Sequence, residues 1–136
     1  IRVPHSSGML EGRYTLETTF PPGDHRIHRP KSWLIAGVQK VETIRFLETA
    51  TRTLGQASIQ WLLAEPRAMS VLPNIYDREQ LREFAGASEC APLTADELAR
   101  IAELAKTNYG VEEPAMKYKG TMSRELTEPA SAMASA

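Results

Sequence analysis

The chain has 136 residues, with 16 Lys and Arg against 17 Asp and Glu, which gives a formal net charge of −1 at pH 7. A near-neutral chain lacks the electrostatic footprint of nucleic-acid or anionic-membrane binding, and its one cysteine, Cys90, excludes an internal disulfide framework and a cysteine-built zinc cage. Hydrophobic residues make up 42%, enough for one packed domain, and no apolar run is long enough for a membrane span or a signal peptide, so we expect a cytoplasmic protein.

Residues 1–33 are predicted to be irregular, because proline and glycine recur every few residues. A loop of this length in a compact domain is more often a binding loop or a lid than an idle connection. Within it, His25 and His28 lie three residues apart without a third ligand, so we interpret them as solvated surface and expect no metal.

The pattern then becomes helical. Apolar residues at intervals of three to four predict an amphipathic helix over about residues 35–51. Residues 56–65 are apolar on nearly all sides, which predicts a buried helix that ends before Pro66. The short apolar run 69–72, which stands between two helices, is predicted to be a buried strand of a parallel sheet.

Two capping signatures predict the last two helices. Asp77 with Gln80 marks one start, and Thr94 with Glu97 marks the other. The second helix should end before Gly110 and bury a stripe made of Leu98, Ile101, Ala102 and Ala105. We therefore divide the chain into a folded segment, 1–111, and a partly disordered tail, 112–136.

The predicted strand 69–72 lacks a confident partner, although residues 1–3 resemble the end of a second strand. A buried strand must pair its backbone groups. The sequence is thus interpreted as part of an α/β protein, which is either a fragment or a chain that completes its sheet against another chain.

Three stretches resemble the C-terminal part of the aldo/keto reductase family. Residues 2–14 are similar to the segment after the seventh strand, where Gly-x-Leu-x-Gly-Lys-Tyr recurs; residues 54–64 are similar to a buried helix with Ala and Trp-Leu-Leu. Residues 70–83 resemble the eighth strand and the nucleotide-binding turn. The resemblance implies a TIM (β/α)8 barrel, of which this mostly helical chain would hold the last two β/α units and be incomplete on its own.

The family reduces carbonyls by hydride transfer from NADPH, and its catalytic Asp, Tyr, Lys and His lie in the first half of the barrel. The resemblance therefore implies no catalytic residue here, and we expect no reductase activity from these 136 residues alone. It does imply binding of NADP or NAD. The matching positions for the pyrophosphate are Ser6, Ser7, Gly8 and Leu10, and those for the adenosine phosphate are Asn74 and Gln80.

The chain departs from the family pattern at several of these positions. Residues 74–76 are Asn-Ile-Tyr where the family has Gly, a hydroxyl residue and a basic residue, and Asp77 places a carboxylate where a ribose phosphate would lie. Phe84 stands where the family has an adenine-side Asn, and His5 where Leu is common. Three alternatives stay open: Arg78 compensates, NADH is preferred, or nucleotide binding is lost.

The sequence supports two functional hypotheses. In the first, the chain is the nucleotide-binding part of an NAD(P)H-dependent reductase of small carbonyl substrates, and its partner is the remainder of the barrel. In the second, it is a non-catalytic barrel remnant that acts as a structural or interaction subunit of a larger complex. Neither hypothesis includes a nucleic-acid partner or a membrane span.

Overall fold

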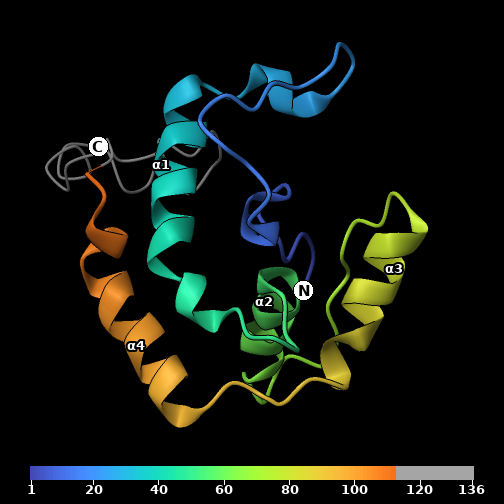
Figure 1. Cartoon of the computed structure of the whole chain (residues 1–136), viewed down its shortest axis with the longest axis vertical. Helices are drawn as coiled ribbons and strands as arrows, with labels where there is room; N and C mark the ends of the chain where they lie inside the picture. Colours follow the sequence, from blue (N-terminus) through green and yellow to red (C-terminus); the bar gives the residue numbers. More distant parts are fainter. Residues whose placement is uncertain (113–136) are drawn as a thin grey trace, which may run out of the picture.

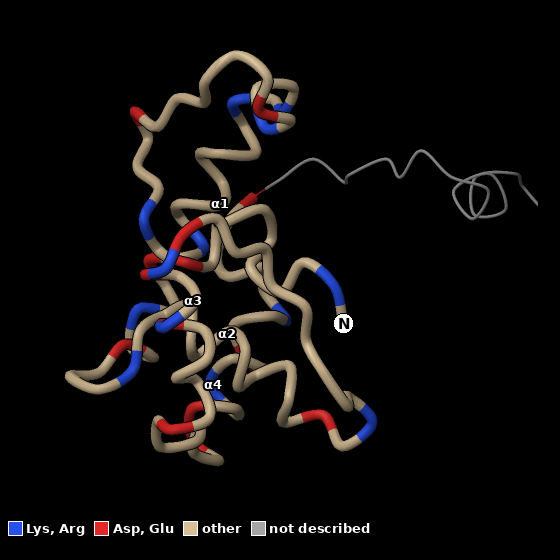
Figure 2. Tube along the Cα trace, turned by 90° about the vertical axis from the view of Figure 1, so that its right-hand side faces the viewer, with Lys and Arg blue, Asp and Glu red and all other residues tan. Residues whose placement is uncertain are grey.

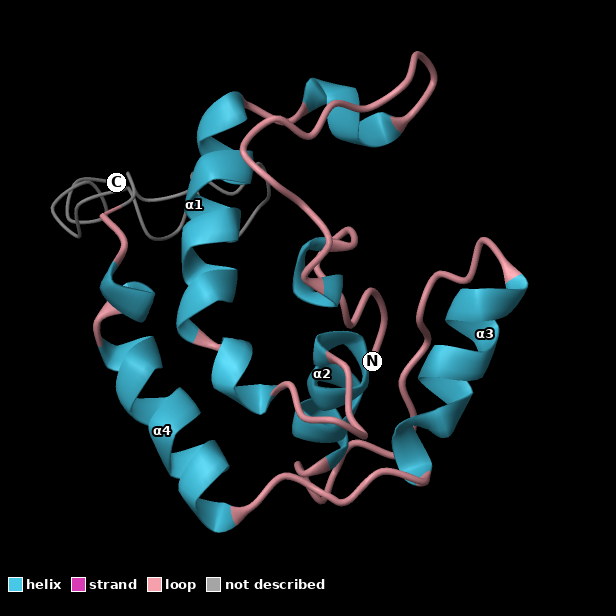
Figure 3. Cartoon of the chain, in the orientation of Figure 1, coloured by secondary structure: helices cyan, strands magenta, loops and turns pink. Residues whose placement is uncertain are grey.

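The computed structural model describes residues 1–112. Four α-helices, joined by long loops and single turns of 3-10 helix, make up its regular structure (Figure 1). Their bounds are α1 Lys31–Thr43, α2 Leu54–Leu63, α3 Arg78–Ala85 and α4 Ala95–Lys106. Within these 112 residues there is no strand (Figure 3), so the predicted α/β class is represented here by its helices alone. The predicted tail lies, except for residue 112, outside the described residues.

The prediction of a buried strand at residues 69–72 is wrong. Met69 is 91% exposed and Leu72 is 65% exposed. One parallel bridge joins Arg2 to Leu72, and the Leu72 amide donates a hydrogen bond to the Ile1 carbonyl at 2.8 Å. The segment therefore pairs with residues 1–3 in the expected direction. However, a buried strand of a parallel sheet also needs a second neighbouring strand and cover on both faces, and the described residues provide neither.

The first two helices begin earlier than the hydrophobic period indicated. α1 begins directly after Pro30, whose fixed φ suits a helix entrance, and it ends at Thr43. α2 begins at Leu54, because Thr53 and Gln56 form a complete capping box. Trp61 on α2 is exposed, so this helix is not buried on all sides as predicted.

Both predicted helix caps are confirmed, but the reciprocal box is complete only at Thr94, because the Gln80 side chain accepts from the Tyr76 amide and not from that of Asp77. The Asp77 carboxylate accepts a hydrogen bond from the Gln80 amide at 2.8 Å. The Thr94 hydroxyl accepts from the Glu97 amide at 3.1 Å, while the Glu97 carboxylate accepts from the Thr94 amide at 2.8 Å. α4 buries Ile101, but other parts of its predicted apolar stripe, such as Ala102, lie exposed.

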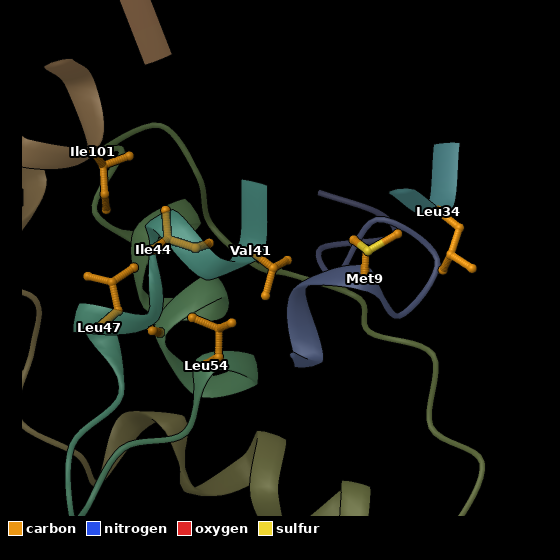
Figure 4. Packing of buried hydrophobic residues seen from close by; sticks show 8 residues of the cluster. Met9, Leu34, Val41, Ile44, Leu47, Leu54 and Ile101 are labelled. Carbon is orange, nitrogen blue, oxygen red and sulfur yellow. The ribbon is translucent and has the colours of Figure 1, made fainter. Parts of the chain in front are cut away.

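The core consists of two clusters on either side of α2. In the first, the fully buried Leu54 packs with residues of the N-terminal turn, α1 and α4 (Figure 4); its labelled members are Met9, Leu34, Val41, Ile44, Leu47, Leu54 and Ile101. In the second, Ile59 of α2 packs against Phe84 and Ala87. α2 thus connects the N-terminal turn to α3. None of the helices in the described part is long and apolar enough to cross a membrane.

Candidate functional site

A cavity of about 350 Å³ lies between the N-terminal turn and the start of α3. One wall comes from residues 3–14, the opposite wall from residues 74–80, and the rim from His25 and Arg26. Two segments that are more than 60 positions apart in sequence therefore build the site.

The N-terminal wall is a left-handed turn. Ser6, Ser7 and Gly8 all have positive φ, at 49°, 61° and 88°. This conformation is costly for residues with a side chain, so other contacts must hold it. Within residues 1–112, neither the Ser7 nor the Gly8 amide donates to a protein acceptor. Two adjacent N–H groups are thus available to an anion, in the manner of phosphate-binding loops.

Tyr14 and Arg26 brace this turn from outside. The Tyr14 hydroxyl donates to the Ser7 carbonyl at 2.7 Å, and the Arg26 guanidinium donates to the Tyr14 hydroxyl at 2.5 Å. Asp24 in turn accepts from the Arg26 guanidinium at 2.9 Å. Burial raises the pKa of Tyr14, and Arg26 only partly opposes this rise. Tyr14 therefore stays protonated and donates a hydrogen bond.

The hydrogen bonds and charge of Arg26 lower the pKa of Asp24 to about 2. The Asp24 hydrogen bond likewise raises the pKa of Arg26. The two groups are therefore an ion pair at every pH at which the protein is expected to work, and the rim of the cavity carries a fixed guanidinium.

The opposite wall is held by Gln80. Its side-chain amide donates to the Glu11 carboxylate at 3.0 Å, and its side-chain carbonyl accepts from the Tyr76 backbone amide at 2.9 Å. Next to it, Arg13 donates to Glu83 of α3 at 2.6 Å. These contacts fasten residues 74–77 to the N-terminal turn.

The cavity is mixed in charge, and Figure 2 shows basic and acidic residues interspersed along the described chain. Arg13 and Arg26 lie on the side of the left-handed turn and its rim, whereas Asp77 lies at the entrance to α3. Arg13 is paired with Glu83 and Arg26 with Asp24, and the Glu11 carboxylate also lines the cavity, so the donors offered to an anion on this side are the Ser7 and Gly8 amides, while the carboxylate of Asp77 repels an anion at the other end. No group of His, Cys, Asp and Glu among residues 1–112 could hold a metal ion.

The structure brings four of the six predicted nucleotide-binding residues to this cavity: Ser7, Gly8, Asn74 and Gln80. Ser6 and Leu10 instead line a separate apolar cavity of about 280 Å³ between the N-terminal turn, α1 and α2. Arg13, Tyr14 and Arg26 were not predicted from the sequence as site residues. For Arg13 and Tyr14 a signal was present, because they stand in the Gly-Lys-Tyr position of the family pattern.

Helices without a sheet in the described residues are consistent with an incomplete β/α barrel. The sequence profile of the Aldo/keto reductase family matches residues 2–106. The chain therefore belongs to this family of oxidoreductases, whose members fold as TIM barrels and generally use NAD(P)H. Searches among curated proteins and among solved structures found no match.

Proposed function

We propose that the chain is the C-terminal portion of a cytoplasmic NAD(P)H-dependent aldo/keto reductase and supplies its nucleotide-binding loops. In this proposal it contributes the last two β/α units of the barrel, and the remainder of the barrel contributes the catalytic residues. NAD(P)H supplies the hydride that reduces a small carbonyl substrate. The observation that carries the proposal is the cavity in which Ser7, Gly8, Asn74 and Gln80 converge.

The residues present fit a pyrophosphate. The free amides of Ser7 and Gly8 are the donors that phosphate oxygens accept. Arg26 lies 3.5 Å from the Ser7 carbonyl, so its positive charge stands beside these donors. Arg13 adds a second, half-exposed guanidinium to the lining.

The entrance to α3 favours NADH over NADPH. Asp77 already accepts from the Gln80 amide, and the Gln80 side chain accepts from the Tyr76 amide. Two donors that would serve an additional phosphate are therefore occupied, and a carboxylate faces the place where the 2′-phosphate would lie.

Replacing Asp77 tests this preference. Asp77→Ser keeps a good helix cap but removes the carboxylate, so the Kd for NADPH should fall about fivefold relative to that for NADH, which corresponds to about 1 kcal/mol of like-charge repulsion. Fluorescence titration of the complete protein with each nucleotide measures both constants. Asp96→Ser, which removes an acid from the first turn of α4 outside the cavity, is the matched control. An unchanged ratio in Asp77→Ser, or an equal change in Asp96→Ser, would contradict the assignment.

The exposed segment 69–72 supports the proposal of a partner that completes the sheet. Its Leu72 amide and Ser70 carbonyl pair with Ile1, while the apolar side chains of Met69 and Leu72 lie in solvent. We propose that a strand of the remaining barrel, or of another protein chain, packs against this segment and completes the sheet. The same exposure also favours the second hypothesis, a non-catalytic interaction subunit.

Two measurements separate these hypotheses. Met69 should be oxidised by peroxide far more slowly in the complete assembly than in the 136-residue chain, because a covering strand removes it from solvent. Equal oxidation rates would refute the proposal that a partner strand covers this segment. Carbonyl-dependent NAD(P)H consumption by the complete assembly then identifies a reductase, whereas protection of Met69 without turnover identifies the interaction subunit.

A further inference from the structure

His5 is a buried polar residue that joins three parts of the candidate site. It is 4% exposed and lines the cavity directly before the left-handed turn. Its Nε2 atom lies 3.0 Å from the carbonyl oxygen of Gly55 in the first turn of α2. Its ring packs on that of Phe84 in α3, with the centroids 4.3 Å apart.

The chemistry of this contact fixes the state of the ring. A carbonyl oxygen only accepts hydrogen bonds, so Nε2 must carry the proton and donate it to Gly55. The ring thus makes two separable contributions, namely a directed hydrogen bond to α2 and apolar packing on α3.

The hydrogen bond acts at the point where the backbone conformation is most costly. Val3, Ser6 and Ser7 all have positive φ although each carries a side chain, and such residues favour a return to negative φ. Tyr14 holds the far side of the turn at the Ser7 carbonyl. On the near side, His5 supplies the side-chain bond to Gly55, while its carbonyl accepts from the Leu10 amide at 3.1 Å.

We propose that His5 is a positioning residue: its hydrogen bond to Gly55 holds the left-handed turn so that the Ser7 and Gly8 amides face the cavity and bind phosphate. This proposal rests on the proposed nucleotide-binding function of the cavity. The packing on Phe84 stabilises the fold but does not set the affinity for phosphate. Losing the bond lets the turn relax, which rotates the two donors away from the anion.

Two amide variants separate the bond from the packing. In His5→Gln the side-chain nitrogen occupies the place of Nε2 and can reach Gly55, whereas in the shorter His5→Asn it occupies the place of Nδ1 and cannot. Both lose the aromatic packing on Phe84, so both should melt below the wild type, and His5→Asn, which also loses the bond, should melt lower than His5→Gln. Calorimetric titration of the complete protein with inorganic pyrophosphate should give a Kd within about threefold of the wild type for Gln, but about tenfold weaker for Asn, as the loss of one hydrogen bond predicts.

A third variant controls for loss of the fold. His5→Phe keeps a ring against Phe84 but has no donor, so its melting temperature should fall less than that of His5→Asn, by the lost hydrogen bond alone, while its pyrophosphate affinity falls as much as that of His5→Asn. Equal pyrophosphate affinities in the Gln and Asn variants, or wild-type affinity in His5→Phe, would overturn the role of His5 and leave the proposed nucleotide site standing. A wild-type protein that does not bind pyrophosphate at all would overturn both.

Discussion

The sharpest prediction concerns Gly8, whose φ is +88° in the wall of the cavity. In Gly8→Ala, the new Cβ would lie 2.4 Å from the Tyr14 hydroxyl oxygen and 3.2 Å from the neighbouring ring carbon. Real Cβ atoms do not approach an oxygen that closely, so the Tyr14 ring must move. Its movement breaks the hydrogen bonds to the Ser7 carbonyl and from Arg26.

The cost follows from these contacts. A left-handed conformation costs a residue with a side chain about 1–2 kcal/mol. Losing one neutral and one charge-assisted hydrogen bond adds about 1 and 2 kcal/mol. We therefore expect Gly8→Ala to lower the free energy of unfolding in urea by about 4 kcal/mol and to weaken pyrophosphate binding as well.

The chain provides a matched control in Gly23. Its φ is +90°, nearly that of Gly8, but a Cβ added there meets nothing within 4 Å. Gly23→Ala should therefore show the conformational cost alone, about 1–2 kcal/mol, with no effect on pyrophosphate. Because Gly8→Ala already breaks both hydrogen bonds of the Tyr14 hydroxyl, adding Tyr14→Phe should lower the stability little further, although Tyr14→Phe alone should lower it. If Gly8→Ala lowers the free energy of unfolding no more than Gly23→Ala does, the close approach of Tyr14 to the turn is wrong.

Two further predictions concern charged groups outside the turn. Arg52 is 5% exposed and pairs with Glu97, so Arg52→Met should lower the free energy of unfolding in urea by about 3–5 kcal/mol, and a loss below 1 kcal/mol would contradict its structural role. Asp24, whose pKa Arg26 lowers from 3.8 to about 2, contributes stability above pH 3.8 that is lost as the pH falls through about 2. An NMR titration of its carboxyl carbon should accordingly have its midpoint near pH 2, and a midpoint near 3.8 would show that the ion pair does not form.

The features predictable from sequence were the local ones. A helix cap depends on residues three apart, so Asp77 with Gln80 and Thr94 with Glu97 marked two helix starts within one residue. The start of α2 carried the same kind of signal in Thr53 and Gln56, and the hydrophobic period alone placed that helix two residues late.

Whether residues 69–72 form a buried strand could not be predicted from these residues alone. The run 69–72 has the composition of a buried strand, but burial is supplied by neighbours, and here Met69 lies almost fully exposed. Arg26 illustrates the same difficulty at the site. It stands in an irregular loop with no local pattern, and its bonds to Tyr14 and Ser7, 12 and 19 residues earlier, bring it to the cavity rim.

The cavity exists because the first 14 residues are docked on residues 55–83. Three of the side-chain bonds that make this connection span 50 to 70 positions of sequence, from His5 to Gly55, between Gln80 and Glu11, and from Arg13 to Glu83, and a fourth runs from the Ser58 hydroxyl to the Leu10 carbonyl. None of them is worth more than about 1–2 kcal/mol, so the docked arrangement depends on their acting together. A ligand that contacts both walls adds its binding free energy to the same equilibrium. Nucleotide affinity and docking of the N-terminal turn are therefore two measures of one process, which is why substitutions at Gly8 and His5 should change both.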